Sequence, residues 1–167
     1  AHSELMHTPH KVATVVGFPL GSMTTKIKVL EAKQAVEQGT SEIDMVLNIG
    51  LLKSGYYKIV EDEIKAVKKA INNTVLKVIF ENCYLTEEEK KRACKLALNA
   101  GTEFIKTSTG CGTGGAIIED VQLMKNEVGD YMQIKASGGI RDKQTALQYI
   151  DRGISRIGTS SGIAIVT

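Results

Sequence analysis

Six short runs rich in β-branched and apolar residues recur along this chain at nearly regular intervals. They span residues 12–16, 43–47, 75–80, 103–107, 132–136 and 154–158, and successive runs start 31, 32, 28, 29 and 22 residues apart. Each interval has room for one helix, and strands that alternate with helices form a parallel sheet covered by helices. The chain is therefore predicted to have an α/β fold, either a doubly wound open sheet or a (β/α) barrel.

The stretches between these runs have helical periodicity. Residues 86–100 open with a capping box, in which Thr86 is followed three residues later by Glu89, and Gly101 follows their end. A second helix is expected over 24–38. Its predicted buried face consists of Ile27, Leu30, Ala35 and Val36. Three further helices are predicted over 56–71, 118–128 and 142–152.

The length of the chain bounds its organisation. Its 167 residues are interpreted as a single domain spanning 1–167, because no Pro/Ser-rich linker or change of composition interrupts the six units. A complete (β/α) barrel has eight units and typically about 250 residues. If the fold is a barrel, it is expected to lack two strand–helix units.

Composition excludes several classes of function. A net charge of +2, with no dense run of Lys or Arg, argues against nucleic acid as a partner. No segment approaches the ~20 apolar residues of a membrane span and the N-terminal residues do not form a signal peptide, so no membrane partner is expected. An odd number of cysteines fits a reducing compartment, so a cytoplasmic location is expected. The three cysteines lack C-x-x-C spacing and the three histidines lack helical metal-site spacing, so no metal site or disulfide framework is expected.

Four of the six predicted strands carry an ionisable residue inside an otherwise apolar run: Asp44, Lys77, Lys106 and Lys135. A charge in such a place is costly unless it is paired, has a shifted pKa or reaches solvent. Lys77 is interpreted in the simplest way, as a strand-end lysine whose amine extends to water. Lys106 and Lys135 differ, because they occupy equivalent positions on consecutive strands and each is followed by Ser and Gly.

The two equivalent lysines indicate amine chemistry. Neighbouring parallel strands lie about 4.8 Å apart, which would bring the two amines close together. Mutual repulsion and burial would then lower a lysine pKa towards neutrality, and a neutral lysine forms Schiff bases with carbonyl compounds. Two interpretations of Asp44 stay open: a structural carboxylate paired with a neighbouring lysine, or a carboxylate that pairs with Lys135 and helps to relay protons.

Three glycine-rich clusters follow strands: GCGTGG (110–115), SGGIR (137–141) and GTSSG (158–162). Glycine lets backbone amides approach a ligand, a helix N-terminus favours an anion, and Arg141 would add a bidentate contact to a phosphate. In barrels a phosphate commonly binds to the loops after the last two strands, which fits the second and third clusters. The alternative is that the clusters are merely tight turns.

The first cluster also matches the pattern G-x-G-x-x-G of dinucleotide-binding loops. It follows the fourth predicted strand rather than the first, and the next strand does not end in an acidic residue. A dehydrogenase with a nicotinamide cofactor is therefore not expected.

The longer motifs resemble those of a known family. The segments VATVVGFPLGSMTT (12–25), EIDMVLNIG (42–50), LKVIFENCYLT (76–86), FIKTSTG (104–110), KASGGIR (135–141) and IGTSSG (157–162) look like successive motifs of bacterial and archaeal deoxyribose-phosphate aldolase. The resemblance implies a TIM (β/α)8-type barrel, of which this chain would hold the third to eighth units. It also implies a class I, metal-independent aldolase without a cofactor. Such an enzyme cleaves 2-deoxy-D-ribose 5-phosphate reversibly to acetaldehyde and D-glyceraldehyde 3-phosphate, so a small phosphorylated sugar and acetaldehyde are the expected partners.

The resemblance implies a role for each matching residue. Lys106 matches the Schiff-base lysine, Lys135 the second lysine that perturbs it and joins the proton relay, and Asp44 the relay carboxylate. The expected substrate- and phosphate-binding positions are Thr109, Gly110, Gly138, Gly139, Arg141, Ser160 and Ser161.

The chain departs from the family at its N-terminal end. Full-length relatives would begin with two further strand–helix units, including an Asp-His-Thr-like motif that nothing here matches. We therefore expect an N-terminally truncated or processed chain whose edge strands, 12–16 and 154–158, lack neighbours. Such a barrel would close through another chain, as a homo-oligomer such as a dimer or with a complementing chain, or else would be marginally stable alone. The alternative function is a catalytically weak phosphosugar-binding or regulatory remnant of such a barrel.

Overall fold

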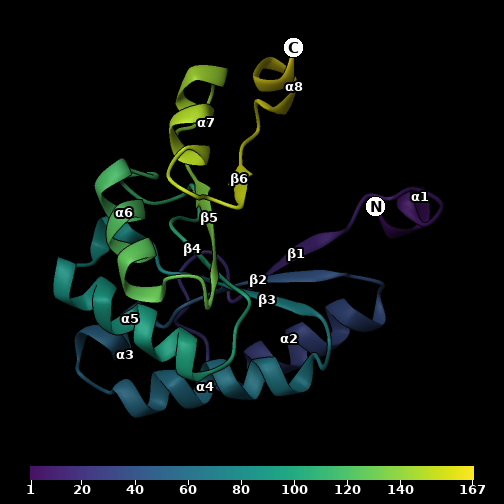
Figure 1. Cartoon of the computed structure of the whole chain (residues 1–167). Coiled ribbons are helices and arrows are strands. Elements are labelled where there is room, and N and C mark those ends of the chain that lie inside the picture. Colours follow the sequence, from purple (N-terminus) through teal and green to yellow (C-terminus); the bar gives the residue numbers. More distant parts are fainter.

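The computed structural model describes all residues, 1–167, and contains one sheet of six parallel strands (Figure 1). The strands are β1 (Ala13–Val16), β2 (Glu42–Val46), β3 (Val75–Ile79), β4 (Phe104–Lys106), β5 (Gln133–Ser137) and β6 (Arg156–Gly158). They are hydrogen-bonded in sequence order from β1 to β6. The six predicted strands are confirmed, with ends that differ by one or two residues.

The sheet is part of a barrel wall rather than a doubly wound open sheet. A doubly wound sheet reverses its strand order at a switch point and carries helices on both faces. Here the order runs from β1 to β6 without reversal, and the long helices lie along the outer side of the curved sheet (Figure 1). The architecture is that of an incomplete (β/α) barrel with six strands, as predicted.

Eight α-helices and one 3-10 helix connect and flank the strands. They are α1 (His2–Leu5), α2 (Thr25–Glu37), α3 (Ile49–Lys53), α4 (Tyr57–Ala70), η1 (Asn82–Tyr84), α5 (Glu87–Asn99), α6 (Ile118–Val128), α7 (Lys143–Ile150) and α8 (Gly162–Val166). The five helices α2, α4, α5, α6 and α7 match the predicted ranges, whereas sequence periodicity does not predict α3 and η1. None of the helices is both long and apolar enough to cross a bilayer.

Helix α5 begins as the sequence pattern predicts. The Thr86 hydroxyl accepts a hydrogen bond from the Glu89 amide at 3.3 Å, and the Glu89 carboxylate accepts one from the Thr86 amide at 2.8 Å. This reciprocal cap satisfies amides that the first helical turn leaves free and stabilises the helix by about 1 kcal/mol. Gly101 follows the helix with a φ of +73°, which lets the chain turn towards β4.

The predicted buried face of α2 is wrong in part. Ile27 and Leu30 are about half exposed, at 49% and 53%, whereas Lys28 and Ala32 are fully buried. The Lys28 amine donates to the Glu63 carboxylate of α4 at 2.6 Å and to the Val46 carbonyl at 3.0 Å. These partners compensate for the burial of the charge, so the helix turns Lys28 inward and leaves Ile27 and Leu30 on its flank.

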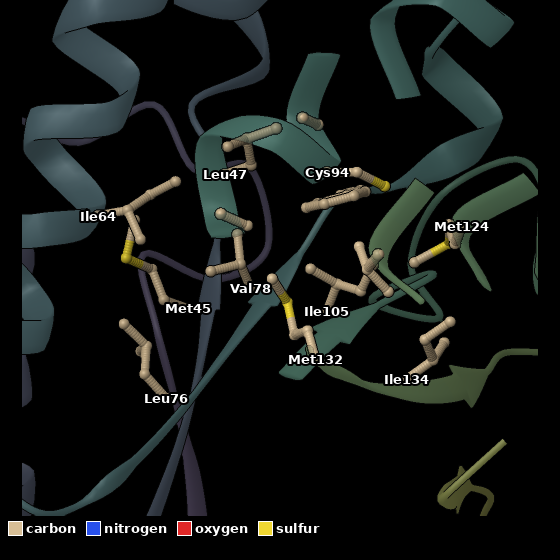
Figure 2. Packing of buried hydrophobic residues seen from close by; sticks show 14 of the residues in the cluster. Met45, Leu47, Ile64, Leu76, Val78, Cys94, Ile105, Met124, Met132 and Ile134 are labelled. Carbon is tan, nitrogen blue, oxygen red and sulfur yellow. The ribbon is translucent and has the colours of Figure 1, made fainter. Parts of the chain in front are cut away.

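The apolar core lies between the outer face of the sheet and the helices. Figure 2 shows Met45 of β2, Val78 of β3, Ile105 of β4 and Ile134 of β5 packed with side chains from the helices. Each fully buried side chain of this size contributes roughly 1.5–3 kcal/mol. Because successive strand residues point to opposite faces, the residues between these apolar positions point to the inner face, which is charged.

Both ends of the sheet are open edges, because β1 pairs with β2 alone and β6 with β5 alone. The segments around these edges expose large apolar side chains: Val15, Leu20, Ile27, Leu30, Ile163 and Val166. Open edges and exposed apolar groups are features that proteins normally cover.

Candidate active site

Three lysines on three strands converge on one carboxylate at the inner face of the sheet. The Nζ atoms of Lys106 and Lys135 both lie 2.9 Å from Oδ2 of Asp44, and the Nζ atom of Lys77 lies 2.8 Å from Oδ1. The parallel register produces this cluster, because it pairs Asp44 with Lys77 and Lys106 with Lys135 on adjacent strands. The predicted proximity of the two equivalent lysines, and the pairing of Asp44 with Lys135, are both observed.

The interpretation of Lys77 as a lysine that reaches water is wrong. Its side chain is fully buried and pairs with Glu42 at 2.7 Å as well as with Asp44. Glu42 also accepts a hydrogen bond from Arg156 of β6. Sequence reasoning missed Glu42, although it lies two residues before Asp44 and must therefore point to the same face of β2. Two carboxylates thus hold Lys77 in a buried network, two register positions before Lys106 in the direction of the strands.

The electrostatics of the cluster favour a charged Asp44. Burial alone would raise the pKa of its carboxyl group, but the charge of Lys106 and the hydrogen bonds from Lys77, Lys106 and Lys135 outweigh burial and hold that pKa well below its usual value. Asp44 is therefore a permanent acceptor for the amines around it.

The pKa of Lys135 shifts in the direction that amine chemistry requires. Burial lowers it below the ordinary value, the hydrogen bond with Asp44 and the charge of Asp44 oppose this effect, and the charges of Lys106 and Lys77 add to the lowering. Removal of water and crowding of cations thus favour the neutral form of Lys135.

A cavity of about 440 Å³ opens beside the lysine cluster. Its lining residues are Lys106, Thr109, Gly110, Ser137, Gly138, Gly139, Ile140, Arg141, Gly158, Thr159 and Ser160. Six of the seven predicted binding residues line it. The exception is Ser161, whose amide donates to the Thr159 hydroxyl at 2.9 Å. Lys135 lies next to the inner wall, because a Cβ atom on Gly158 would come within 3.1 Å of its Cε atom.

Glycine is required at Gly138 because of the neighbouring loop. The φ of Gly138 is +89°, and a Cβ atom there would lie 2.8 Å from the Cα atom of Gly115. The Ala116 amide donates to the Gly138 carbonyl at 3.0 Å, and the buried Tyr149 hydroxyl donates to the Ala116 carbonyl at 2.7 Å. The loop after β4 and the loop after β5 thus form one packed wall.

The cavity has the chemistry of an anion site at one end and of an amine site at the other. Arg141, in the loop after β5, lines the wall and makes no ion pair with a carboxylate of the chain. Guanidinium groups bind phosphate in proteins, and so do backbone amides in glycine-rich loops, where no side chain blocks the approach of the ligand. Lys106 lies in the same cavity, so a phosphorylated carbonyl compound fits both ends.

Comparisons with known proteins agree with this geometry. Residues 1–166 match the model of a family described as DeoC/LacD family aldolase. The chain is 57% identical over 155 residues to the deoxyribose-phosphate aldolase of Finegoldia magna, covering 93% of this chain and 73% of the relative. It is 56% identical over 158 residues to that of Thermococcus kodakarensis, covering 93% and 70%.

Solved structures of aldolases share the fold. One described as QR15, an aldolase, superposes with a TM-score of 0.93 at 45% identity, over 98% of this chain and 76% of that one. The deoxyribose phosphate aldolase of Aeropyrum pernix, described as a tetramer, superposes with a TM-score of 0.88 at 30% identity, over 98% and 68%. The chain belongs to the DeoC/LacD family of aldolases.

Proposed function

We propose that this chain is a class I aldolase that cleaves 2-deoxy-D-ribose 5-phosphate to acetaldehyde and D-glyceraldehyde 3-phosphate through a Schiff base on Lys106. Relatives at 57% and 56% identity are named deoxyribose-phosphate aldolase. The observation that carries the proposal is the pair of lysine amines, Lys106 and Lys135, at one oxygen of Asp44 beside a glycine-walled cavity.

Lys106 supplies the nucleophile. Its neutral amine adds to carbon 1 of the open-chain sugar, and loss of water gives a protonated imine. When the bond between carbons 2 and 3 breaks, its electron pair moves into the imine to form an enamine. The carbon 3 hydroxyl loses its proton and becomes the aldehyde of glyceraldehyde 3-phosphate. Protonation of the enamine at carbon 2 and hydrolysis release acetaldehyde and the free amine of Lys106.

Lys135 and Asp44 move the protons for these steps. The lowered pKa of Lys135 brings its proton exchange closer to neutral pH than that of an ordinary lysine. Asp44 stays ionised because its pKa is lowered, and its Oδ2 atom accepts a hydrogen bond from each amine. A water molecule held by Asp44 and Lys135 completes the relay. That water carries protons to and from carbon 2 and the carbon 3 hydroxyl.

The glycine-walled end of the cavity binds the phosphate of the sugar. Backbone amides near Gly138 and Gly139, with Arg141 and Ser160, surround the phosphate, while Lys106 engages carbon 1 at the other end. Binding energy from the phosphate thereby orients the aldehyde towards the amine. Ser161 does not line the cavity, and its amide donates to the Thr159 hydroxyl. The loop must therefore shift before Ser161 can contact the phosphate.

The test is direct cleavage of 2-deoxy-D-ribose 5-phosphate with both products measured. The account predicts equal release of acetaldehyde and glyceraldehyde 3-phosphate, reduced to background by Lys106→Ala. Lys26→Ala is the matched control, because Lys26 is an exposed lysine on α2. Binding of the sugar phosphate without any cleavage would contradict the enzyme and support a phosphosugar-binding remnant.

A second chain covers the open edges β1 and β6 in solution, either another copy or a complementing chain. The unpaired edges and the exposed apolar residues Leu20, Ile27 and Ile163 support this part of the proposal. Sedimentation velocity at several concentrations tests it, with oligomers as the expected result. A monomer that unfolds cooperatively at low concentration would contradict it.

A further inference from the structure

Glu81 is a buried carboxylate that the proposed mechanism does not use. It follows β3, is 2% exposed and forms no ion pair with a lysine or arginine of the chain. Its backbone is left-handed, with φ of +54° and ψ of +62°, a conformation that costs energy for a residue with a side chain. A buried charge without a counter-ion also costs energy unless hydrogen bonds compensate. The surroundings of its carboxylate therefore indicate what Glu81 does.

Two residues donate hydrogen bonds to the Glu81 carboxylate: Thr109 makes most of them, and the Cys83 thiol lies 4.0 Å from Oε1. The Thr109 amide lies 3.2 and 3.3 Å from the two carboxylate oxygens, and the Thr109 hydroxyl is hydrogen-bonded to one of them. Because a carboxylate can only accept, the hydroxyl must donate its proton to Glu81. The same hydroxyl oxygen accepts a hydrogen bond from the Cys111 amide at 2.9 Å.

These contacts determine what the Thr109 hydroxyl can offer to a ligand. A hydroxyl group has one proton to donate and two lone pairs that accept. Glu81 takes the proton and Cys111 occupies one lone pair, which leaves one lone pair free. Thr109 lines the same cavity as Lys106, so it can accept a hydrogen bond from a ligand there but cannot donate one.

We infer that Glu81 is a positioning residue, which orients the Thr109 hydroxyl as a hydrogen-bond acceptor for a hydroxyl group of the sugar. The inference rests on the proposed function. In the open-chain substrate the groups between the imine carbon and the phosphate are hydroxyls at carbons 3 and 4, which can donate. Glu81 thus selects a hydroxylated sugar phosphate over a compound with a carbonyl at that position.

The test compares two reactions of Glu81→Gln. Glutamine replaces one of the two acceptor oxygens with an NH2 group that can only donate, and its remaining oxygen is a neutral, weaker acceptor, so it holds the Thr109 hydroxyl less firmly. We expect kcat/KM for cleavage of 2-deoxy-D-ribose 5-phosphate to fall about 10- to 100-fold, the loss typical of a charge-assisted hydrogen bond. Borohydride trapping of acetaldehyde on Lys106 should stay within about twofold of the unmodified chain, because acetaldehyde has no hydroxyl group. Glu88→Gln is the matched control, since that side chain is 84% exposed.

Thr109→Val keeps the inference testable if Glu81→Gln does not fold. It should show the same loss in cleavage and the same unchanged trapping, and full cleavage activity in Thr109→Val would overturn the inference. Where Glu81→Gln folds, the double variant should be no worse than Thr109→Val alone. Full cleavage activity in a folded Glu81→Gln variant, or an equal loss in both reactions, would overturn the role of Glu81. If the unmodified chain neither traps acetaldehyde nor cleaves the sugar, the proposed function fails, and this inference fails with it.

Discussion

Lys106 and Lys135 share one hydrogen-bond acceptor: each amine lies 2.9 Å from the same Oδ2 atom of Asp44. The two lysines are paired in the register of adjacent strands, so the sheet itself holds them side by side. Two cations at one oxygen repel each other, and burial adds to that repulsion. Burial, together with the charges of Lys106 and Lys77, lowers the pKa of Lys135, whereas the hydrogen bond with Asp44 opposes that lowering.

Asp44→Asn should destabilise the fold as well as abolish cleavage. Asp44 is 3% exposed and its carboxylate contacts three amines, so its removal leaves buried cations with less compensation. Loss of one partner from a buried ion pair typically costs about 3–5 kcal/mol. Chemical denaturation of both chains measures this cost. A loss well under 1 kcal/mol would show that the network contributes little to stability.

The stability that Asp44 provides should depend on pH in a defined direction. Its pKa is lower in the folded chain than in the unfolded chain, so its contribution is fully present above the unfolded value of about 4 and is lost as the pH falls through the folded value. The difference in unfolding free energy between the unmodified chain and Asp44→Asn should stay constant from about pH 7 to 6 and shrink below about pH 4. A difference that grows towards acidic pH contradicts this electrostatic account.

Gly138→Ala should impair phosphate binding more than Gly139→Ala. Both glycines have a positive φ, which costs a residue with a side chain about 1–3 kcal/mol. At Gly138 the new Cβ atom would also meet the Cα atom of Gly115 at 2.8 Å, whereas at Gly139 it would meet nothing within 4 Å. Titration with inorganic phosphate measures the difference. Gly50→Ala on α3 is the control, because its φ is not positive and its new Cβ atom would meet only Asn48 Oδ1, at an ordinary 3.6 Å. Equal affinities in all three variants would remove these loops from the phosphate site.

Lys28→Met should destabilise the chain more than most lysine substitutions. Burial lowers the pKa of Lys28 and the contact with Glu63 opposes that effect, so each charge compensates the other. Without Lys28 the Glu63 carboxylate is buried without a cation, at a cost of about 3–5 kcal/mol. The double variant Lys28→Met/Glu63→Leu should recover most of the loss in denaturant unfolding. Lys58→Met, from an exposed pair, should have little effect. A double variant as unstable as Lys28→Met alone would contradict this explanation.

Local signals predicted the elements that depend on neighbouring residues. The six strands follow from runs of β-branched residues, and α5 follows from Thr86, Glu89 and Gly101. The proximity of Lys106 and Lys135 followed from equivalent positions on consecutive strands.

The buried charged residues could not be predicted from the sequence, because each depends on a partner that is distant along the chain. The buried charge of Lys28 is compensated by Glu63, 35 residues away, and that of Lys77 by Asp44, 33 residues away. Glu81 is compensated by Thr109, 28 residues away. A charged residue is buried only where the fold brings a partner to it. Hydrophobic periodicity describes neighbouring residues and does not identify a partner that is distant in the sequence, so these buried charges could not be predicted.

The central claim is that Lys106 becomes covalently bound to the carbonyl carbon of the substrate. Incubation with acetaldehyde and sodium borohydride, followed by peptide mapping in a mass spectrometer, tests it most directly. The account predicts a two-carbon addition on Lys106, absent in Lys106→Ala and formed more slowly in Lys135→Leu. No addition, or addition spread over exposed lysines with Lys106 unmodified, would contradict the account.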